Sequence, residues 1–214
     1  NERNANAGLV VGIEPVDFPQ SFPQDAPLWT AAFGEQDGPR YAAQATALAA
    51  EGKSHPLAGI VLQRELEARA YQLGGGTYEA PGQLVGDFVA RRPSSALGEV
   101  VPSYQPGVKL VDLAPALPAY AIEAMREALP VFGRKIKGYD MADAVLTGVE
   151  TRTSAPLRIT RGEDFQSLNT RGLYPAGEGA GYAGGILSAG VDGLKVAEAL
   201  VLDLLKAHRP GARA

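Results

Sequence analysis

The residues best suited to chemistry lie between positions 172 and 200. This segment reads G-L-Y-P-A-G-E-G-A-G-Y-A-G-G-I-L-S-A-G-V-D-G-L-K-V-A-E-A-L, with six glycines from Gly172 to Gly185. Because glycine has no Cβ, backbone N–H groups in such a stretch can approach a ligand closely. The helix expected next adds unpaired N–H groups and a partial positive charge at its N-terminus. The segment predicts a cradle for an anion or an electron-rich heteroatom. The alternative is a glycine-rich connection that packs a helix tightly on a sheet.

Composition argues against several classes of function. A net charge of −4 and a pI near 5.3 do not suit a nucleic-acid-binding surface, which needs a concentrated basic patch. The chain has no cysteine, so disulfides, thiolate catalysis and zinc–thiolate sites are excluded. The two histidines, His55 and His208, are far apart, so we expect no metal site and interpret His55 as structural or exposed. No apolar run approaches the ~18 residues of a membrane span, so we expect a cytoplasmic protein without a membrane partner.

Apolar spacing and helix-breaking residues place the expected elements. Strands are expected at 8–13, 145–151 and 157–160, and helices at 41–50, 57–73, 81–88, 117–129 and 185–207. Three consecutive glycines, Gly74–Gly76, stop the helix that ends at Leu73. Pro81 occupies the first position of its short helix, and Pro130 ends the next one. This order predicts an α+β fold, with short strands among the helices and a final strand–loop–helix unit.

The last helix carries the clearest amphipathic pattern. Its apolar positions recur at helical spacing, namely Leu187, Val191, Leu194, Ala197, Val201 and Leu204. Gly190 and Gly193 lie inside the helix, where each costs up to about 1 kcal/mol relative to alanine. Close approach of another backbone or of a ligand is the simplest compensation for that cost.

Four segments carry a resemblance to a known family. They are R-N-A-N-A-G-L-V-V-G at 3–12, G-G-G-T-Y-E-A-P-G-Q-L-V-G-D-F at 74–88, T-G-V-E-T-R-T-S-A-P-L-R-I at 147–159, and the glycine-rich run at 173–193. The last segment resembles the C-terminal flavin-binding segment of the two-dinucleotide-binding-domain flavoproteins. All four resemble a group of bacterial FAD-dependent dehydrogenases, in the same order and nearly end to end.

The resemblance implies that part of the family's fold is missing here. The G-x-G-x-x-G strand–turn–helix that holds the ADP half of FAD has no counterpart in this chain and lies N-terminal to the matching region in the family. A strand expected so close to residue 1 also suggests a piece cut from a longer chain. We therefore expect a strand of the flavin domain at 1–12, a cap or substrate domain at 13–150, and a C-terminal segment of the FAD domain at 151–214, whose Rossmann half is absent.

The resemblance also implies which residues bind the cofactor. They are Gly177, Glu178, Gly179, Tyr182, Gly184, Gly185 and Ile186. The carboxylate of Glu178 would accept hydrogen bonds from the ribityl or phosphate end of FAD. The helix N-terminus at Gly184–Ile186 would point at the flavin N1–C2=O edge, which gains negative charge on reduction. Tyr182 would flank the isoalloxazine ring, or alternatively serve as an ordinary packing residue.

The catalytic candidates precede this segment, where the family places chain near the flavin. They are Arg152, Ser154 and Arg158, and either arginine could orient a substrate carboxylate. The alternative is a scaffold of salt bridges. The sequence names no substrate.

The leading hypothesis is the C-terminal part of an FAD-dependent oxidoreductase that acts on a small molecule by hydride transfer through the flavin. Without the Rossmann half, the chain is expected to bind FAD weakly or not at all and to be inactive alone. One alternative is a non-catalytic cap module that binds a substrate or partner. A phosphate-binding NTPase is a weaker alternative, because no G-K-[ST] follows the glycines. Loss of the Rossmann half would leave an apolar face of the final helix uncovered, so we expect a homodimer through that face.

Overall fold

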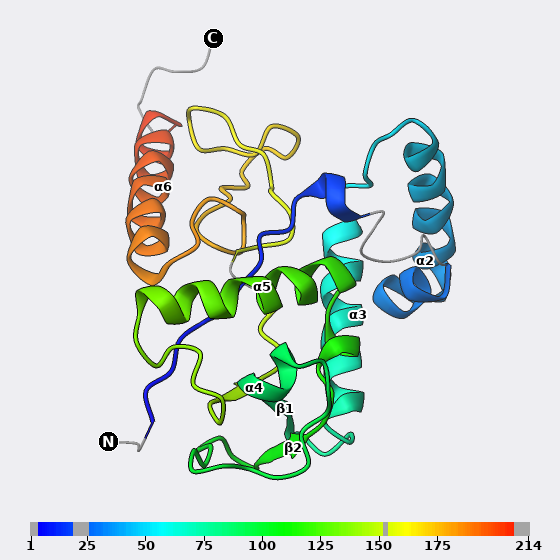
Figure 1. Ribbon diagram of the computed structural model, residues 1–214. Coiled ribbons are helices and arrows are strands. Elements are labelled where there is room, and N and C mark those ends of the chain that lie inside the picture. The colour runs from blue at the N-terminus through cyan, green and yellow to red at the C-terminus, as the bar shows by residue number, and fades with distance from the viewer. Residues whose placement is uncertain (1–3, 19–25, 152–153, 208–214) are drawn as a thin grey trace. The chain divides into compact units, whose positions relative to one another are not determined.

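The computed structural model describes residues 4–18, 26–151 and 154–207 (Figure 1). The chain divides into two compact units, residues 1–151 (unit 1) and 152–214 (unit 2). The described residues form five α-helices and a three-stranded mixed sheet, which confirms the α+β class. None of these helices is long and apolar enough to cross a membrane.

The first core of unit 1 lies between two helices. Helix α2 (Ala26–Ala50) follows the short 3₁₀ helix η1 (Pro15–Asp17) and is kinked at Gly34, and helix α3 is Ala58–Leu73. The two ends predicted from sequence are confirmed, since α2 stops before Glu51-Gly52 and α3 stops at the three glycines. Apolar residues of both helices form one buried cluster, namely Trp29, Ala32, Ala42, Ala45, Ala58, Val61, Leu62 and Leu66.

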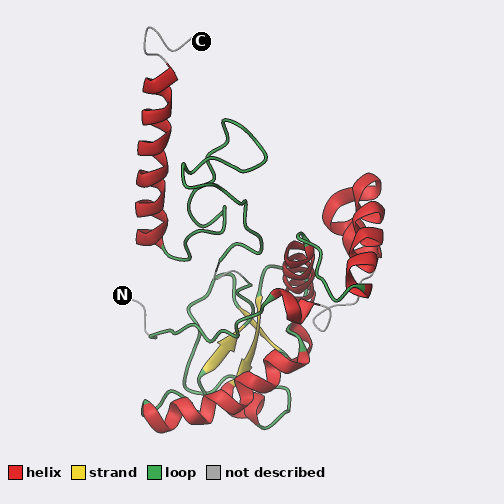
Figure 2. Cartoon of the chain, turned by 90° about the horizontal axis from the view of Figure 1, so that it is seen from above, coloured by secondary structure: helices red, strands yellow, loops and turns green. Residues whose placement is uncertain are grey.

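The sheet has its longest strand in the middle. Strand β1 (Ala80–Leu84) pairs in parallel with β2 (Val108–Leu110) and antiparallel with β3 (Val145–Thr147), in the order β2-β1-β3. Figure 2 shows these strands in yellow beside the helices of unit 1. The side chain of Gln83 is completely buried, donates to Arg92 O at 2.7 Å and accepts from Leu113 N at 2.9 Å. Its polar atoms are therefore satisfied by backbone groups of the chain that follows α4 and of the chain that follows β2.

A second core packs beneath the sheet. It is built by helix α4 (Val85–Val89), the 3₁₀ helix η2 (Ala114–Ala116) and helix α5 (Ala119–Lys135). Its buried side chains are Val85, Phe88, Leu113, Ala116, Ile122 and Leu129.

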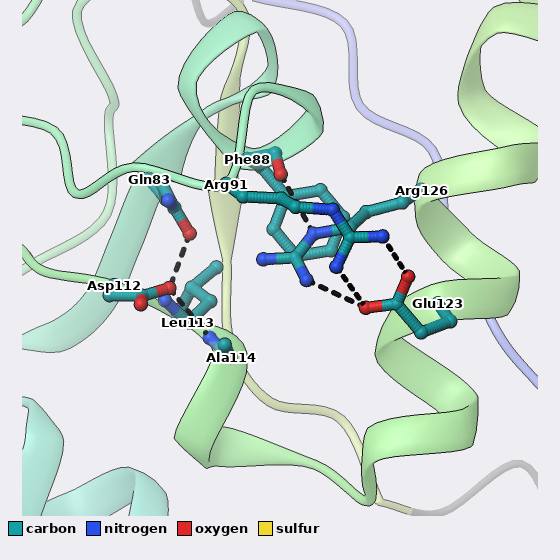
Figure 3. A network of polar contacts seen from close by, with 8 residues as sticks. All are labelled: Gln83, Phe88, Arg91, Asp112, Leu113, Ala114, Glu123 and Arg126. Carbon is teal, nitrogen blue, oxygen red and sulfur yellow. Dashed lines mark hydrogen bonds and ion pairs between the residues drawn. The ribbon is translucent and has the colours of Figure 1, made fainter.

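An arginine fastens α5 to α4 at the edge of this core. Arg126 is 9% exposed, donates to Phe88 O at 2.9 Å and to Glu123 Oε1 at 2.9 Å, and lies 4.9 Å from the centroid of the Phe88 ring. Figure 3 shows this arginine and Arg91 meeting at the same Glu123 carboxylate. The arrangement ties two helices together without a direct role in the sheet.

Several predicted elements of unit 1 are wrong in part. The helix expected at 41–50 already begins at Ala26, and the strand expected at 145–151 ends at Thr147.

Two further predictions, both based on prolines, are also wrong in part. Pro81 lies in β1, and the short helix begins only at Val85. The strand tolerates this proline because Pro81 needs to offer only its C=O, which accepts from Gly148 N, while pairing with β3 begins at Gly82. Helix α5 runs through Pro130 to Lys135. Packing of the final turn offsets the lost backbone bond, since Leu129 is buried and the Phe132 ring contacts the Tyr139 ring at 5.4 Å.

Two predicted strands are not formed. Residues 8–13 and 157–160 have no regular structure in the described chain, and only Arg161 and Ser167 form an isolated bridge near the second run. An apolar run becomes a strand only when a partner strand supplies hydrogen bonds, and neither run has one here. That residues 1–12 belong to a flavin domain stays a prediction.

Unit 2 consists of a looped segment and one helix. Helix α6 (Ile186–Ala207) matches the prediction for 185–207 within one residue, and Figure 2 shows the preceding chain as loop. Leu187 is 85% exposed, and the side chains of Val191, Leu194, Val201 and Leu204 are also exposed. No atom lies within 4 Å of the position of a Cβ at Gly190 or Gly193, so the described chain does not supply the close approach that we expected there.

His55 should make unit 1 sensitive to mild acid. The imidazole is buried, accepts from Leu57 N at Nδ1 (3.1 Å), pairs through Nε2 with Gln44 Oε1 (3.3 Å) and lies 4.9 Å from the Trp29 ring. Burial lowers the pKa of His55 from its ordinary value of 6.5, so the unfolded chain takes up a proton first as the pH falls. We expect the free energy of unfolding to decrease as the pH drops below about 6.5.

Denaturant unfolding between pH 7.5 and 5 measures this effect. In the control variant His55→Asn, an amide oxygen replaces Nδ1 as acceptor and no proton can be gained. The difference in unfolding free energy between wild type and variant should shrink toward pH 5, and a pH-independent difference would contradict the assignment.

Candidate functional site: the glycine turn before α6

The glycine turn, residues 177–185, is folded by its own backbone hydrogen bonds. Gly181 N donates to Glu178 O at 2.9 Å and Tyr182 N donates to Gly177 O at 3.1 Å. Gly181 has φ +81°, and a Cβ there would lie 2.6 Å from Leu157 O. Only glycine fits this position, because a side chain would be strained and would also collide with the neighbouring backbone.

An ion pair between the loop and the helix holds the start of the turn. Arg161 donates to both carboxylate oxygens of Asp192 in α6, from Nη1 at 2.9 Å and from Nη2 at 2.6 Å. The side chains are only 9% and 14% exposed, respectively. Arg161 Nη1 also donates to Pro175 O at 2.7 Å, two residues before the turn. This two-point pairing fixes the orientation of both side chains.

The Asp192 carboxylate also accepts a hydrogen bond from the turn itself. Gly177 N donates to Asp192 Oδ2 at 2.8 Å, where Gly177 has φ +66°. Hydrogen bonds from Arg161 and from Gly177 N lower the pKa of Asp192 from 3.8 to about 2. The same pairing raises the pKa of Arg161. Asp192 is thus a permanent anion at neutral pH, and the first residue of the turn is anchored to it.

Aromatic rings enclose the arginine. The Arg161 guanidinium lies 3.7 Å from the centroid of the Tyr182 ring and 4.7 Å from that of Phe165. The Tyr182 hydroxyl accepts from Arg161 N at 3.0 Å. Arg158 donates from Nε to Gly181 O at 3.0 Å, and its guanidinium lies 5.1 Å from the Tyr182 ring. Tyr182 therefore packs against two arginines of the preceding loop.

The far end of the turn is open. Gly184, Gly185 and Ile186 are exposed, and Ile186 is 94% exposed. Ser188 Oγ accepts from Gly185 N at 3.2 Å and donates to Gly185 O at 2.9 Å, which caps the first turn of α6. In the part of the chain that the structure describes, the N–H groups of residues 186–188 have no acceptor.

The remaining predicted site residues are distributed differently. Glu178 and Gly179 are exposed on the turn, and nothing lies within 4 Å of a Cβ at Gly179. Arg158 joins the turn, whereas Ser154 is an exposed residue of the preceding loop. Arg152 lies outside the described residues.

Sequence reasoning missed the two residues that hold the turn. Arg161 follows the segment 157–160, which was expected to be a strand, and Asp192 lies on a face of α6 away from the apolar stripe that contains Leu187 and Leu194. No local signal distinguished Asp192, because α6 also contains the charged residues Lys195, Glu198, Asp203 and Lys206. The partner could not be identified before the loop was placed against the helix.

Strong acid should remove this anchor. Because the folded-state pKa of Asp192 lies below the ordinary value of 3.8, its stabilising effect is complete above about pH 4 and is lost as the pH falls to about 2. Above pH 4, Asp192→Asn should lower the free energy of unfolding by about 3 kcal/mol, because it leaves a buried arginine without its counter-charge. The difference between wild type and Asp192→Asn in urea unfolding should shrink from pH 4.5 to pH 2. A difference that stays constant over this interval would contradict the pairing.

Comparison with known proteins assigns the chain to a family. The chain belongs to the family described as FAD-dependent protein, C-terminal domain-like, whose model matches residues 41–153. It is 46% identical over 198 residues to a protein of Clostridium beijerinckii that is described as an uncharacterized protein. That alignment covers 92% of this chain and 31% of the relative, so the chain spans less than a third of the relative's length.

Proposed function

We propose that this chain is the C-terminal part of an FAD-dependent oxidoreductase and that its glycine turn holds the edge of the flavin ring. The observation that carries the proposal is the open end of the turn, where the N–H groups of residues 186–188 have no acceptor among the described residues and the helix dipole is positive. The family description and the much longer relative support a C-terminal role in a larger flavoprotein.

The donor set fits a flavin. The N1–C2=O edge of the ring is an acceptor that becomes more negative on reduction, and backbone N–H groups at a helix N-terminus suit such an edge. Exposed Gly184 and Gly185 leave space beside these donors, because neither has a side chain. In this proposal Glu178 accepts hydrogen bonds from ribityl hydroxyls, since its carboxylate lies exposed on the same turn.

Bound FAD would supply hydride transfer, and the residues of this chain would bind and orient it. Tyr182 packs against Arg158 and Arg161, and this packing holds one side of the turn in place. Arg152, Ser154 and Arg158 remain the candidates for contact with a small-molecule substrate. Arg158 Nε donates to Gly181 O, so the Nη groups, which have no acceptor among the described residues, are the ones that would contact a substrate.

The exposed side of α6 is proposed to pack against the rest of the full-length protein. Its side chains include Leu187, Leu194 and Val201, and its glycines leave room for close approach. Because the upstream part would complete the cofactor site, this chain alone should bind FAD weakly or not at all.

Titration with FAD tests the proposal directly. The full-length protein should bind FAD in a 1:1 ratio and show a structured visible flavin spectrum, whereas the 214-residue chain should leave the FAD spectrum and fluorescence unchanged. Failure of the full-length protein to bind FAD would refute the proposed function. Tight binding by the chain alone would refute its dependence on an upstream domain.

A second candidate function is a cap module that binds a substrate or partner without catalysis. The observation that favours it is the position of the family match, residues 41–153, which lies almost entirely within unit 1. Unit 1 also has two hydrophobic cores of its own. An FAD-free full-length protein that retains ligand binding would favour this alternative.

A further inference from the structure

We propose that Arg161 and Asp192 form a positioning pair that sets the glycine turn in its cofactor-binding geometry before FAD arrives. This inference rests on the proposed function and extends it to two residues whose hydrogen bonds hold the chain before the turn and the first residue of the turn. Arg161 and Asp192 act through the backbone of the turn, so they are positioning residues and not catalytic ones.

The hydrogen bonds of Arg161 and Asp192 all involve the glycine turn, the chain just before it, or each other. The Arg161 side chain reaches Pro175 O, its backbone N–H reaches the Tyr182 hydroxyl, and Asp192 accepts from Gly177 N. The chain before the turn, the first residue of the turn and its tyrosine are thus held by these two residues. Their remaining hydrogen bonds join them to each other.

A gain in the stability of the fold does not by itself explain why a charged pair is present at this position. Removing two charges from water costs free energy that their attraction only partly returns, and well-packed apolar residues often serve as well. What the charged pair adds is a fixed relative orientation of the two side chains, because a guanidinium and a carboxylate that are joined by two hydrogen bonds permit only one orientation. Here the fixed orientation of the Asp192 carboxylate in turn fixes Gly177 N, which donates to Asp192 Oδ2.

The pair also fixes the turn against the helix that carries the free donors. Asp192 is in α6, less than two helical turns after the N–H groups of residues 186–188. By holding Gly177 to Asp192, the pair sets the position of the start of the turn relative to those donors. A binding site whose donors are already placed loses less conformational entropy when the ligand binds.

Arg126 provides a matched control. Like Arg161 it is 9% exposed, forms an ion pair, donates to a backbone carbonyl and stacks on an aromatic ring, but it lies in unit 1 against Phe88 (Figure 3). Arg126→Met and Arg161→Met therefore remove similar interactions from two places. Only the second should affect the glycine turn.

The experiment measures FAD affinity in the full-length protein. Arg161→Met and Asp192→Asn should each raise the Kd for FAD about tenfold or more, as happens when residues that support a ligand's contacts are removed. Arg126→Met should lower the melting temperature of the apoprotein by a similar amount and leave the Kd within about twofold. Arg161→Lys should give an intermediate Kd, since it keeps the charge but loses the two-point geometry.

Hydrogen exchange gives a readout that does not need FAD. In the 214-residue chain, the amide of Gly177 should exchange faster in Asp192→Asn and Arg161→Lys while the helical circular dichroism is retained. If the wild-type full-length protein binds FAD and the Arg161 and Asp192 variants bind it equally well, the positioning role is overturned and the proposed function stands. If the wild type binds no FAD, both fail.

Discussion

Replacing Gly181 with alanine is expected to lower the free energy of unfolding of unit 2 by about 3 kcal/mol. Two costs add at this position. The backbone has φ +81°, which an alanine adopts only under strain, and the new Cβ would lie 2.6 Å from Leu157 O and 3.0 Å from the Cα of Arg158. Both of these close contacts are with backbone atoms, so rotation of a side chain cannot relieve them. The bond from Arg158 to Gly181 O should be lost as well.

Gly179→Ala is the matched control in the same turn. No atom lies within 4 Å of a Cβ at this position, so the substitution should change the unfolding free energy by less than about 0.5 kcal/mol. Urea unfolding followed by tyrosine fluorescence would compare the two variants. Equal stabilities would show that the turn does not adopt the conformation described here.

The second large effect concerns self-association of the chain through α6. We expect the 214-residue chain to dimerise or to form larger assemblies, and the double substitution Leu194→Lys and Val201→Lys to convert it to a monomer. Both side chains are exposed on a helix whose apolar face is not covered by the described residues of unit 2, and apolar patches of this kind drive association. Charged residues on that face would have to be desolvated in any such contact.

Sedimentation velocity over a range of concentrations measures this difference. Leu168→Lys is the control, because Leu168 is 69% exposed but lies in the loop of unit 2 and not on α6. It should leave the oligomeric state unchanged. A monodisperse wild-type monomer at high concentration would contradict the expected association.

Local signals in the sequence were sufficient for most helices. The periodic apolar residues of α6 and the glycines after α3 gave correct boundaries within about one residue, because helix formation depends on neighbours three and four positions away. Prolines predicted the ends of helices and strands less accurately. Pro130 lies inside α5 and Pro81 lies inside β1. Whether the missing N–H of a proline costs free energy depends on the packing around it and on the pairing pattern of the sheet.

Strands depended on partners that the sequence does not reveal. The segments 8–13, 145–147 and 157–160 were all expected to form strands, but among the described residues only 145–147 pairs with β1. A strand is stabilised by hydrogen bonds to a neighbour that can be distant along the chain, so its composition alone does not decide its formation.

The sequence by itself determined that a glycine-rich turn precedes a long amphipathic helix and that its N-terminus could face an electron-rich group. The tertiary structure alone decided how that turn is held. Arg161 and Asp192 are 31 positions apart, and neither carries a recognisable motif, yet they meet at 2.6 Å, and Asp192 accepts a hydrogen bond from the N–H of the first residue of the turn. Pairing of charges over such a separation depends on how the loop folds back on the helix. Local residue patterns carry no information on that path, because it results from all the packing contacts of the unit together.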